Sequence, residues 1–228
     1  MNEILAKIAS MSDIWEKLII LLLGWLLGLL GPAIVDGIRR KRENKLGRTA
    51  ILSELHDVGG ILATVVYTVK TKEGSIDREH LQWLKAYIEK GERSEPYPGW
   101  VGRLETFLSW SDEEIARNFG AMRVGKGKGT MLQKYPVPLL DSRVTALWSF
   151  DSAFQRSLLE IRQRLHRLDD MVDRQRKLHD MTFSNIEGVN RDALNENITE
   201  TCSFYAESAR KVVDLIAKIT VDKKNALG

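Results

Sequence analysis

The stretch LIILLLGWLLGLLGPAIV, at residues 18–35, is the most apolar part of this chain of 228 residues. It holds eighteen consecutive residues without a charge, and twelve of them are Leu, Ile or Val. As a helix it is about 27 Å long, close to the ~30 Å hydrocarbon core of a bilayer. Core helices of soluble proteins seldom stay uncharged for so long. Because Ile14, Trp15 and Ile38 extend the run, we expect a transmembrane helix over residues 14–38.

The charges beside this run predict its orientation. Residues 36–48 contain six basic and two acidic residues, and four of the basic ones are Arg39, Arg40, Lys41 and Arg42. A cleaved signal peptide carries its positive charge before the apolar run, so this alternative is disfavoured. Positive flanks stay in the cytoplasm, which predicts a cell (inner) membrane protein with its N-terminus outside and its C-terminal domain inside. We expect the basic juxtamembrane segment 39–48 to contact anionic lipid headgroups.

Three glycines fall on one face of the expected membrane helix. Gly24, Gly28 and Gly31 are spaced at i, i+4 and i+7, and Gly24-x-x-x-Gly28 is a spacing that lets two helices approach closely. Glycine is also common in membrane helices generally, so the alternative is that the spacing has no role in helix association. We take these residues as the candidate helix-association face.

The residues before the membrane helix form a short N-terminal segment, 1–13. Ile4, Leu5, Ile8 and Met11 recur there at helical spacing. Such a segment favours an amphipathic turn or two lying in the membrane interface.

Residues 49–228 are expected to form one cytoplasmic helical-bundle domain. Six aliphatic residues between Ile51 and Val69 alternate steps of four and three, which is a heptad pattern. Further helices are predicted over 77–90, 101–108, 112–119, 139–183 and 190–221, with a capping box at Ser111 and Glu114. No alternating strand pattern of useful length occurs. The predicted fold class is all-α, with a single N-terminal transmembrane helix and a bundle of long coiled-coil-like helices.

A single polar residue interrupts the longest predicted helix. Apolar residues keep the heptad from Leu140 to Val172, and only Asp151 breaks it. One polar residue inside an apolar seam can set the register or the number of helices, at some cost in stability. We therefore expect Asp151 to be a buried polar residue of the seam.

The sequence GAMRVGKG, at residues 120–127, is one residue away from a phosphate-binding loop. The pattern requires a preceding strand and a Ser or Thr after the Lys, and here Gly127 takes that place. Nucleotide hydrolysis is therefore disfavoured. Residues 117–134 nevertheless carry five basic residues and no acid. The segment is either a plain basic loop or an anion-binding loop with Arg123, Lys126 and Lys128 as its contacts.

No catalytic motif accompanies these features. The four histidines are not paired at i+3 or i+4, and Cys202 is a lone cysteine, which suits a reducing compartment. We predict no enzyme, cofactor or metal site, although a site assembled across helices stays open. Acids interleave with the Arg-rich stretch 160–177, so nucleic acid and nucleotides are disfavoured as partners without being excluded.

Together these features favour a non-enzymatic, membrane-anchored scaffold that self-associates or binds a cytoplasmic protein partner. The expected partners are membrane lipids and either a second copy of the chain or another protein. The alternative is an effector, triggered by a ligand or partner, that perturbs the membrane. One-helix effectors of bacterial antiviral defence share this broad layout, which is an analogy of architecture alone.

Overall fold

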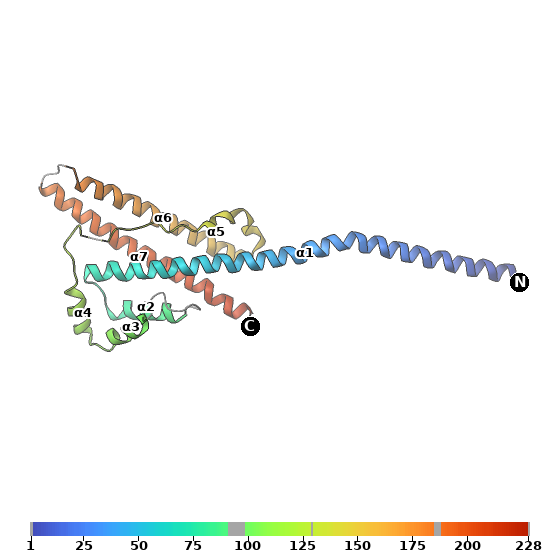
Figure 1. The fold of residues 1–228 in the computed structure, drawn as a ribbon, viewed down its shortest axis with the longest axis horizontal. Helices are drawn as coiled ribbons and strands as arrows, with labels where there is room; N and C mark the ends of the chain where they lie inside the picture. Colours follow the sequence, from blue (N-terminus) through green and yellow to red (C-terminus); the bar gives the residue numbers. More distant parts are fainter. Residues whose placement is uncertain (1, 91–98, 129, 185–187, 228) are drawn as a thin grey trace. The chain divides into compact units, whose positions relative to one another are not determined.

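The computed structural model describes residues 2–90, 99–128, 130–184 and 188–227 (Figure 1). The described residues contain helices and loops and no strand, which confirms the all-α fold class. The chain divides into two compact units, Met1–Thr49 and Ala50–Gly228. Helix α1 (Asn2–Glu73) contributes to both units.

The first unit is the N-terminal part of α1, and its apolar side chains are exposed. Leu21 is 72% exposed, Trp25 65% and Leu27 68%, although such side chains are normally buried. A side chain built at Gly24 or Gly28 would meet no atom within 4 Å, so this face is open. Gly31 is helical, but its surroundings lie outside the described residues. In the basic segment, Arg39 forms an ion pair of 2.8 Å with Glu43, one turn later.

Near the N-terminus, one described helix is long and apolar enough to cross a membrane, judged by length and composition alone. That window lies within Ile34–Glu73, and 44% of it is buried in the protein. The other described apolar stretch in this part of the chain is Leu18–Gly28, which is shorter and exposed. The two stretches belong to the same helix but differ in what surrounds them.

The second unit is a helical bundle built on the C-terminal part of α1. Figure 1 shows α6 (Ser152–Thr182) and α7 (Gly188–Leu227) side by side as a long hairpin. Four shorter helices complete the described part of the unit: α2 (Arg78–Lys90), α3 (Trp100–Leu108), α4 (Asp112–Gly120) and α5 (Pro138–Ser142). A 3₁₀ helix, η1 (Val144–Ser149), leads from α5 towards α6.

The core of the bundle is apolar and follows the predicted heptads. On α1, five of the six predicted seam residues are buried, and Val65 is partly buried. The seam of α6 is buried from Phe154 to Val172, and α7 adds a wide stripe that includes Tyr205 and Ile216. This burial provides the main driving force for folding the unit.

Two neighbouring helices approach α1 closely at Gly59. A Cβ at this position would collide with the hydroxyl of Tyr87 on α2 and would touch Ile216 on α7. The Tyr87 hydroxyl is buried and has no hydrogen-bond partner among the described residues. Burial raises its pKa well above the ordinary value, and nearby Asp57 adds to the rise. Glycine at position 59 therefore permits the close contact of α1 with α2 and α7.

Local capping explains where the shorter helices begin and end. Gly74 adopts a φ of +66°, which ends α1 in a left-handed turn. Asp77 accepts a hydrogen bond of 2.8 Å from the backbone N–H of His80 at the start of α2. The capping box predicted at Ser111 and Glu114 is confirmed at the start of α4.

The prediction of a continuous helix over 139–183 is wrong. Pro138 starts the short helix α5, η1 follows, and α6 begins only at Ser152. Leu140 and Leu147 are still buried, so the apolar spacing is satisfied by two short helices instead of one long one.

The prediction that Asp151 is a buried seam residue is wrong for the same reason. Asp151 is exposed and lies at the N-cap of α6, where its carboxylate accepts a hydrogen bond of 2.8 Å from the N–H of Phe154. An acidic N-cap satisfies a free N–H group and suits the positive end of the helix dipole.

Candidate functional site: a basic strap over a cavity

The basic segment between α4 and α5 crosses three helices of the bundle. We call its described residues, 121–128 and 130–137, the strap. Two of its side chains, Leu132 and Val137, are buried in the core. The strap is therefore docked on the bundle and is more than a plain solvent-exposed loop.

The first part of the strap is fixed to α1 and α7 by backbone groups. The N–H of Val124 donates to the carbonyl of Lys72 at 2.9 Å, and the N–H of Gly127 donates to Thr199 Oγ1 at 3.2 Å. Gly127 has a φ of +78°, and a Cβ there would collide with Asn195. Glycine is thus required at position 127 both by its backbone conformation and by the close approach to α7.

Gln175 on α6 holds the middle of the strap. Its side chain is buried, and its Oε1 accepts a hydrogen bond of 2.8 Å from the N–H of Leu132. Its Nε2 donates to the carbonyl of Thr130 at 2.7 Å and to Cys202 Sγ at 3.1 Å. One amide therefore satisfies both a donor and an acceptor of the strap, which a buried backbone segment needs.

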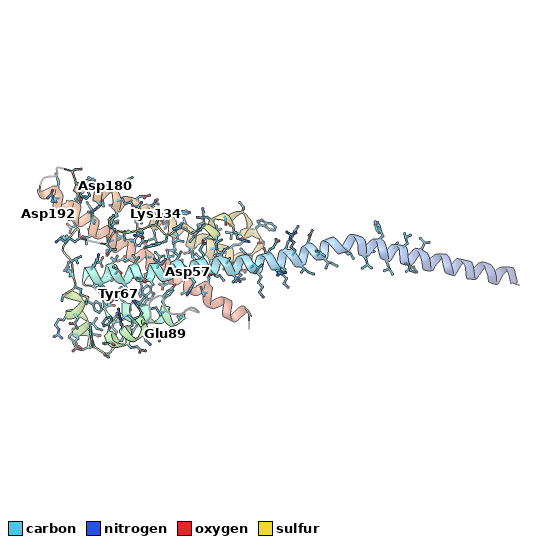
Figure 2. The ribbon with its side chains drawn as sticks, viewed as in Figure 1. Asp57, Tyr67, Glu89, Lys134, Asp180 and Asp192 are labelled. Carbon is cyan, nitrogen blue, oxygen red and sulfur yellow. The ribbon has the colours of Figure 1, made fainter. Side chains whose placement is uncertain are left out.

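Ion pairs fix the strap at two further points. Lys126 Nζ lies 2.9 Å from Glu196 Oε1 on α7, and Lys134 Nζ lies 2.6 Å from Asp173 Oδ2 on α6. Figure 2 labels Lys134, whose segment runs beside the α6–α7 hairpin. Both pairs are well exposed, so each contributes little to stability and acts mainly as a positional contact.

A cavity of about 450 Å³ lies between the strap, the end of α1 and the N-terminal half of α7. Its lining combines aliphatic, basic, acidic, hydroxyl and thiol side chains. The lining residues are Val69, Lys72, Glu73, Arg123, Val124, Gly125, Lys126, Thr130, Thr199 and Cys202. This volume falls within the range of about 300–1,000 Å³ that is typical of small-molecule sites.

Among the described residues, some charged side chains around the cavity form ion pairs and others do not. Lys126 is paired with Glu196, whereas neither Lys72 nor Arg123 forms an ion pair with an acid in the described part of the chain. Glu73 uses one oxygen, Oε2, to accept from Lys70 and from Ser75 at 3.0 Å each. Its other oxygen, Oε1, is buried and has no hydrogen-bond partner among the described residues.

The thiol of Cys202 lies in the cavity wall but is not an activated nucleophile. Burial raises the pKa of the Cys202 thiol above its ordinary value, and the hydrogen bond from Gln175 only partly offsets the rise. Because the thiolate is the reactive form, this environment suits a packing residue. Among the described residues, no group of three His, Cys, Asp or Glu side chains is placed to hold a metal ion.

The structure brings together only some of the residues singled out in the sequence. Arg123 and Lys126 line the cavity, whereas Lys128 is an exposed strap residue that is not part of the lining. Gly24, Gly28 and the basic run 39–42 belong to the first unit. Asp151 is a helix cap and has no place in this site.

Three residues of the site were missed in the sequence: Lys72, Glu73 and Gln175. Gln175 had a detectable pattern, because it continues the α6 heptad three residues after Val172 and is thus the polar residue on that seam. Lys72 and Glu73 had no detectable pattern, because they lie at the end of a helix among other charged residues. Their role depends on where the strap lies.

Comparison with known proteins does not extend this picture. No family model matches the chain, and no curated protein or solved structure matches it significantly.

Proposed function

We propose that this chain is a single-pass membrane-anchored scaffold that holds its helical bundle at the cytoplasmic face of the cell membrane. The observation that carries the proposal is the exposed apolar surface that the described side chains of α1 form between Leu18 and Val35. Among the described residues of the first unit none covers that surface, so lipid is its natural environment. The apolar window farther along α1 is a poorer candidate, because Ile51, Leu55 and Leu62 form the bundle core.

The basic segment after the apolar stretch supports the cytoplasmic orientation. Arg40, Lys41 and Arg42 are exposed, and Arg39 forms an ion pair with Glu43. Basic side chains at this place contact anionic headgroups, each contributing about 1 kcal/mol. The segment therefore fixes both the orientation and the depth of the anchor.

Self-association is the proposed scaffold activity, with the face of Gly24 and Gly28 as the contact between anchors. The space beside both glycines is open, which allows a second helix to approach closely. A scaffold of this kind works by local concentration, because two anchors in one membrane bring their bundles together without a catalytic step.

The test is the mass of the full chain in detergent, measured by light scattering, for the wild type and for Gly28→Ile. We expect a defined oligomer for the wild type and a monomer for Gly28→Ile, with Leu27→Ile as the matched control that leaves the oligomer intact. A monomeric wild type that captures no cytoplasmic protein would exclude the scaffold role. An oligomer that survives Gly28→Ile would move the contact away from the glycine face.

A second function is favoured by the cavity under the strap, namely a membrane-perturbing effector that is triggered by a ligand or partner. The measurement is the membrane potential of bacteria in which the full chain is induced, with and without phage. Depolarisation would support the effector, and an unchanged potential under both conditions would exclude it.

A further inference from the structure

We infer that the cavity between the strap, α1 and α7 is a binding site for a phosphomonoester. The inference goes beyond the proposed scaffold role and does not depend on it, because every residue involved lies in the second unit. It rests on unpaired cations, on buried polar atoms without partners and on the size of the cavity.

The charge of the site calls for a dianion. Lys72 on α1 and Arg123 on the strap both line the cavity, and neither is neutralised by an acid among the described residues. A phosphomonoester carries a charge of about −1.5 to −2 at pH 7, which matches two cations, whereas a single carboxylate would leave one unmatched. A planar guanidinium also binds phosphate oxygens in a bidentate manner.

The buried polar atoms add a second requirement. Glu73 Oε1 and Thr130 Oγ1 are both buried and without a hydrogen-bond partner in the described chain. Both atoms are shielded from solvent in the unliganded bundle, and a buried acceptor without a donor costs free energy. Rotation of either side chain towards a ligand that brings an N–H or O–H group would therefore be favourable. A phosphate attached to a hydroxylated or amino-bearing body supplies both functions, while bare phosphate supplies only the first.

The size and the apolar wall limit the body of the ligand. Val69 and Val124 line the same cavity as the charged residues. A space of about 450 Å³ is large enough for a body of nucleoside size beside the phosphate. A nucleoside monophosphate is therefore a suitable soluble probe, and a phosphatidic acid headgroup is the membrane source of the same chemistry.

Binding of the ligand would also stabilise the docked position of the strap. The ligand would be held by Lys72 and Glu73 at the end of α1 and by Arg123 and Thr130 on the strap, two parts of the chain about fifty residues apart in sequence. A ligand that binds the docked strap and not the undocked one stabilises the docked form.

The experiment is calorimetric titration of the full chain in detergent micelles. The probes are AMP, adenosine, glutamate and, in mixed micelles, phosphatidic acid. We expect AMP to bind and adenosine and glutamate not to bind. Arg123→Gln and Lys72→Gln should each weaken AMP about tenfold, because each removes one charge-assisted contact. Lys128→Gln, on the same strap but outside the cavity, is the matched control and should bind like the wild type.

The outcomes separate the possible sources and the failure of the inference. AMP binding that is weakened about tenfold in each variant supports a soluble phosphomonoester, and binding of phosphatidic acid alone, with the same weakening, assigns the site to a lipid headgroup. The inference is overturned if neither phosphomonoester binds the folded wild type, if glutamate binds instead, or if Lys128→Gln weakens binding as much as Arg123→Gln. Thermal unfolding of each variant checks that the bundle is intact. None of these results decides whether the anchors self-associate.

Discussion

The two parts of helix α1 are made of similar residues and differ in what surrounds them. The described aliphatic side chains between Leu18 and Val35 are exposed, whereas most of those between Ile51 and Val69 are buried in the bundle core. The first part is apolar on all sides, and the second has an apolar seam with polar residues between. A helix that is apolar on all sides is buried either in a protein core or in lipid, while a seam requires only partner helices. The contrast shows that the pattern, more than the amount, of apolar residues distinguishes the proposed anchor from the core part of the helix.

The largest expected effect is on membrane insertion. We predict that the double change Leu22→Arg and Leu26→Arg releases the full chain from the membrane fraction after alkaline extraction. Two arginines near the centre cost about 6 kcal/mol, comparable to the roughly 4–7 kcal/mol that twelve aliphatic residues contribute. Leu46→Arg, on an exposed position of the basic segment, is the control and should stay with the membranes. Retention of the double variant would show that the apolar stretch is not the anchor.

The next effect concerns the core part of the same helix. Leu62→Ala should lower the free energy of unfolding of the bundle by about 2–5 kcal/mol, because Leu62 is 0% exposed and leaves a cavity. Leu21→Ala should leave that free energy unchanged, since Leu21 lies outside the bundle. Chemical unfolding in detergent, followed by tryptophan fluorescence, measures both. Equal effects of the two variants would remove the distinction between the two parts of α1.

A smaller effect is expected where the bundle holds the strap. Gln175→Ala should destabilise the bundle by about 2 kcal/mol, because the N–H of Leu132 and the carbonyl of Thr130 lose their partners. It should also speed cleavage of the strap by a protease. Gln163→Ala, on an exposed face of α6, is the matched control. If cleavage of the Gln175 variant is no faster, the strap is held by its other contacts.

The smallest effect tests the corrected role of Asp151. Asp151→Ala should cost about 1 kcal/mol of stability through loss of the N-cap of α6. Asp151→Asn should retain most of it, since asparagine also caps helices well. A residue buried in a seam would behave differently, because its replacement by Ala would stabilise the bundle. The same unfolding measurement therefore distinguishes a cap from a seam residue.

The sequence predicted those features that depend on local patterns. The heptad of α1 and the capping box at Ser111 each involve residues a few positions apart, and both are present. The long helix over 139–183 was wrong because an apolar heptad continued across Asp151, and the competing preference of Asp151 for an N-cap was given too little weight.

The candidate site was only half predictable. Arg123 and Lys126 were found because basic residues cluster around glycines in the strap. Lys72 and Glu73 precede Arg123 by about fifty residues in the sequence. No local spacing predicts that they line the same cavity as the strap. Gln175 could have been recognised as the polar residue of the α6 seam had the seam been followed to its end.

The contacts of the strap also bear on the order in which the bundle forms. Leu132 forms a hydrogen bond with a residue 43 positions later. Gly127 and Gln133 each form a hydrogen bond with a residue 72 positions later. Such distant partners are available only after α6 and α7 have paired. Closing long loops before that point costs conformational entropy that no hydrogen bond or packing contact offsets. The strap is therefore expected to dock last during folding and to be the first segment to open, and the cavity beneath it exists only in the fully assembled bundle.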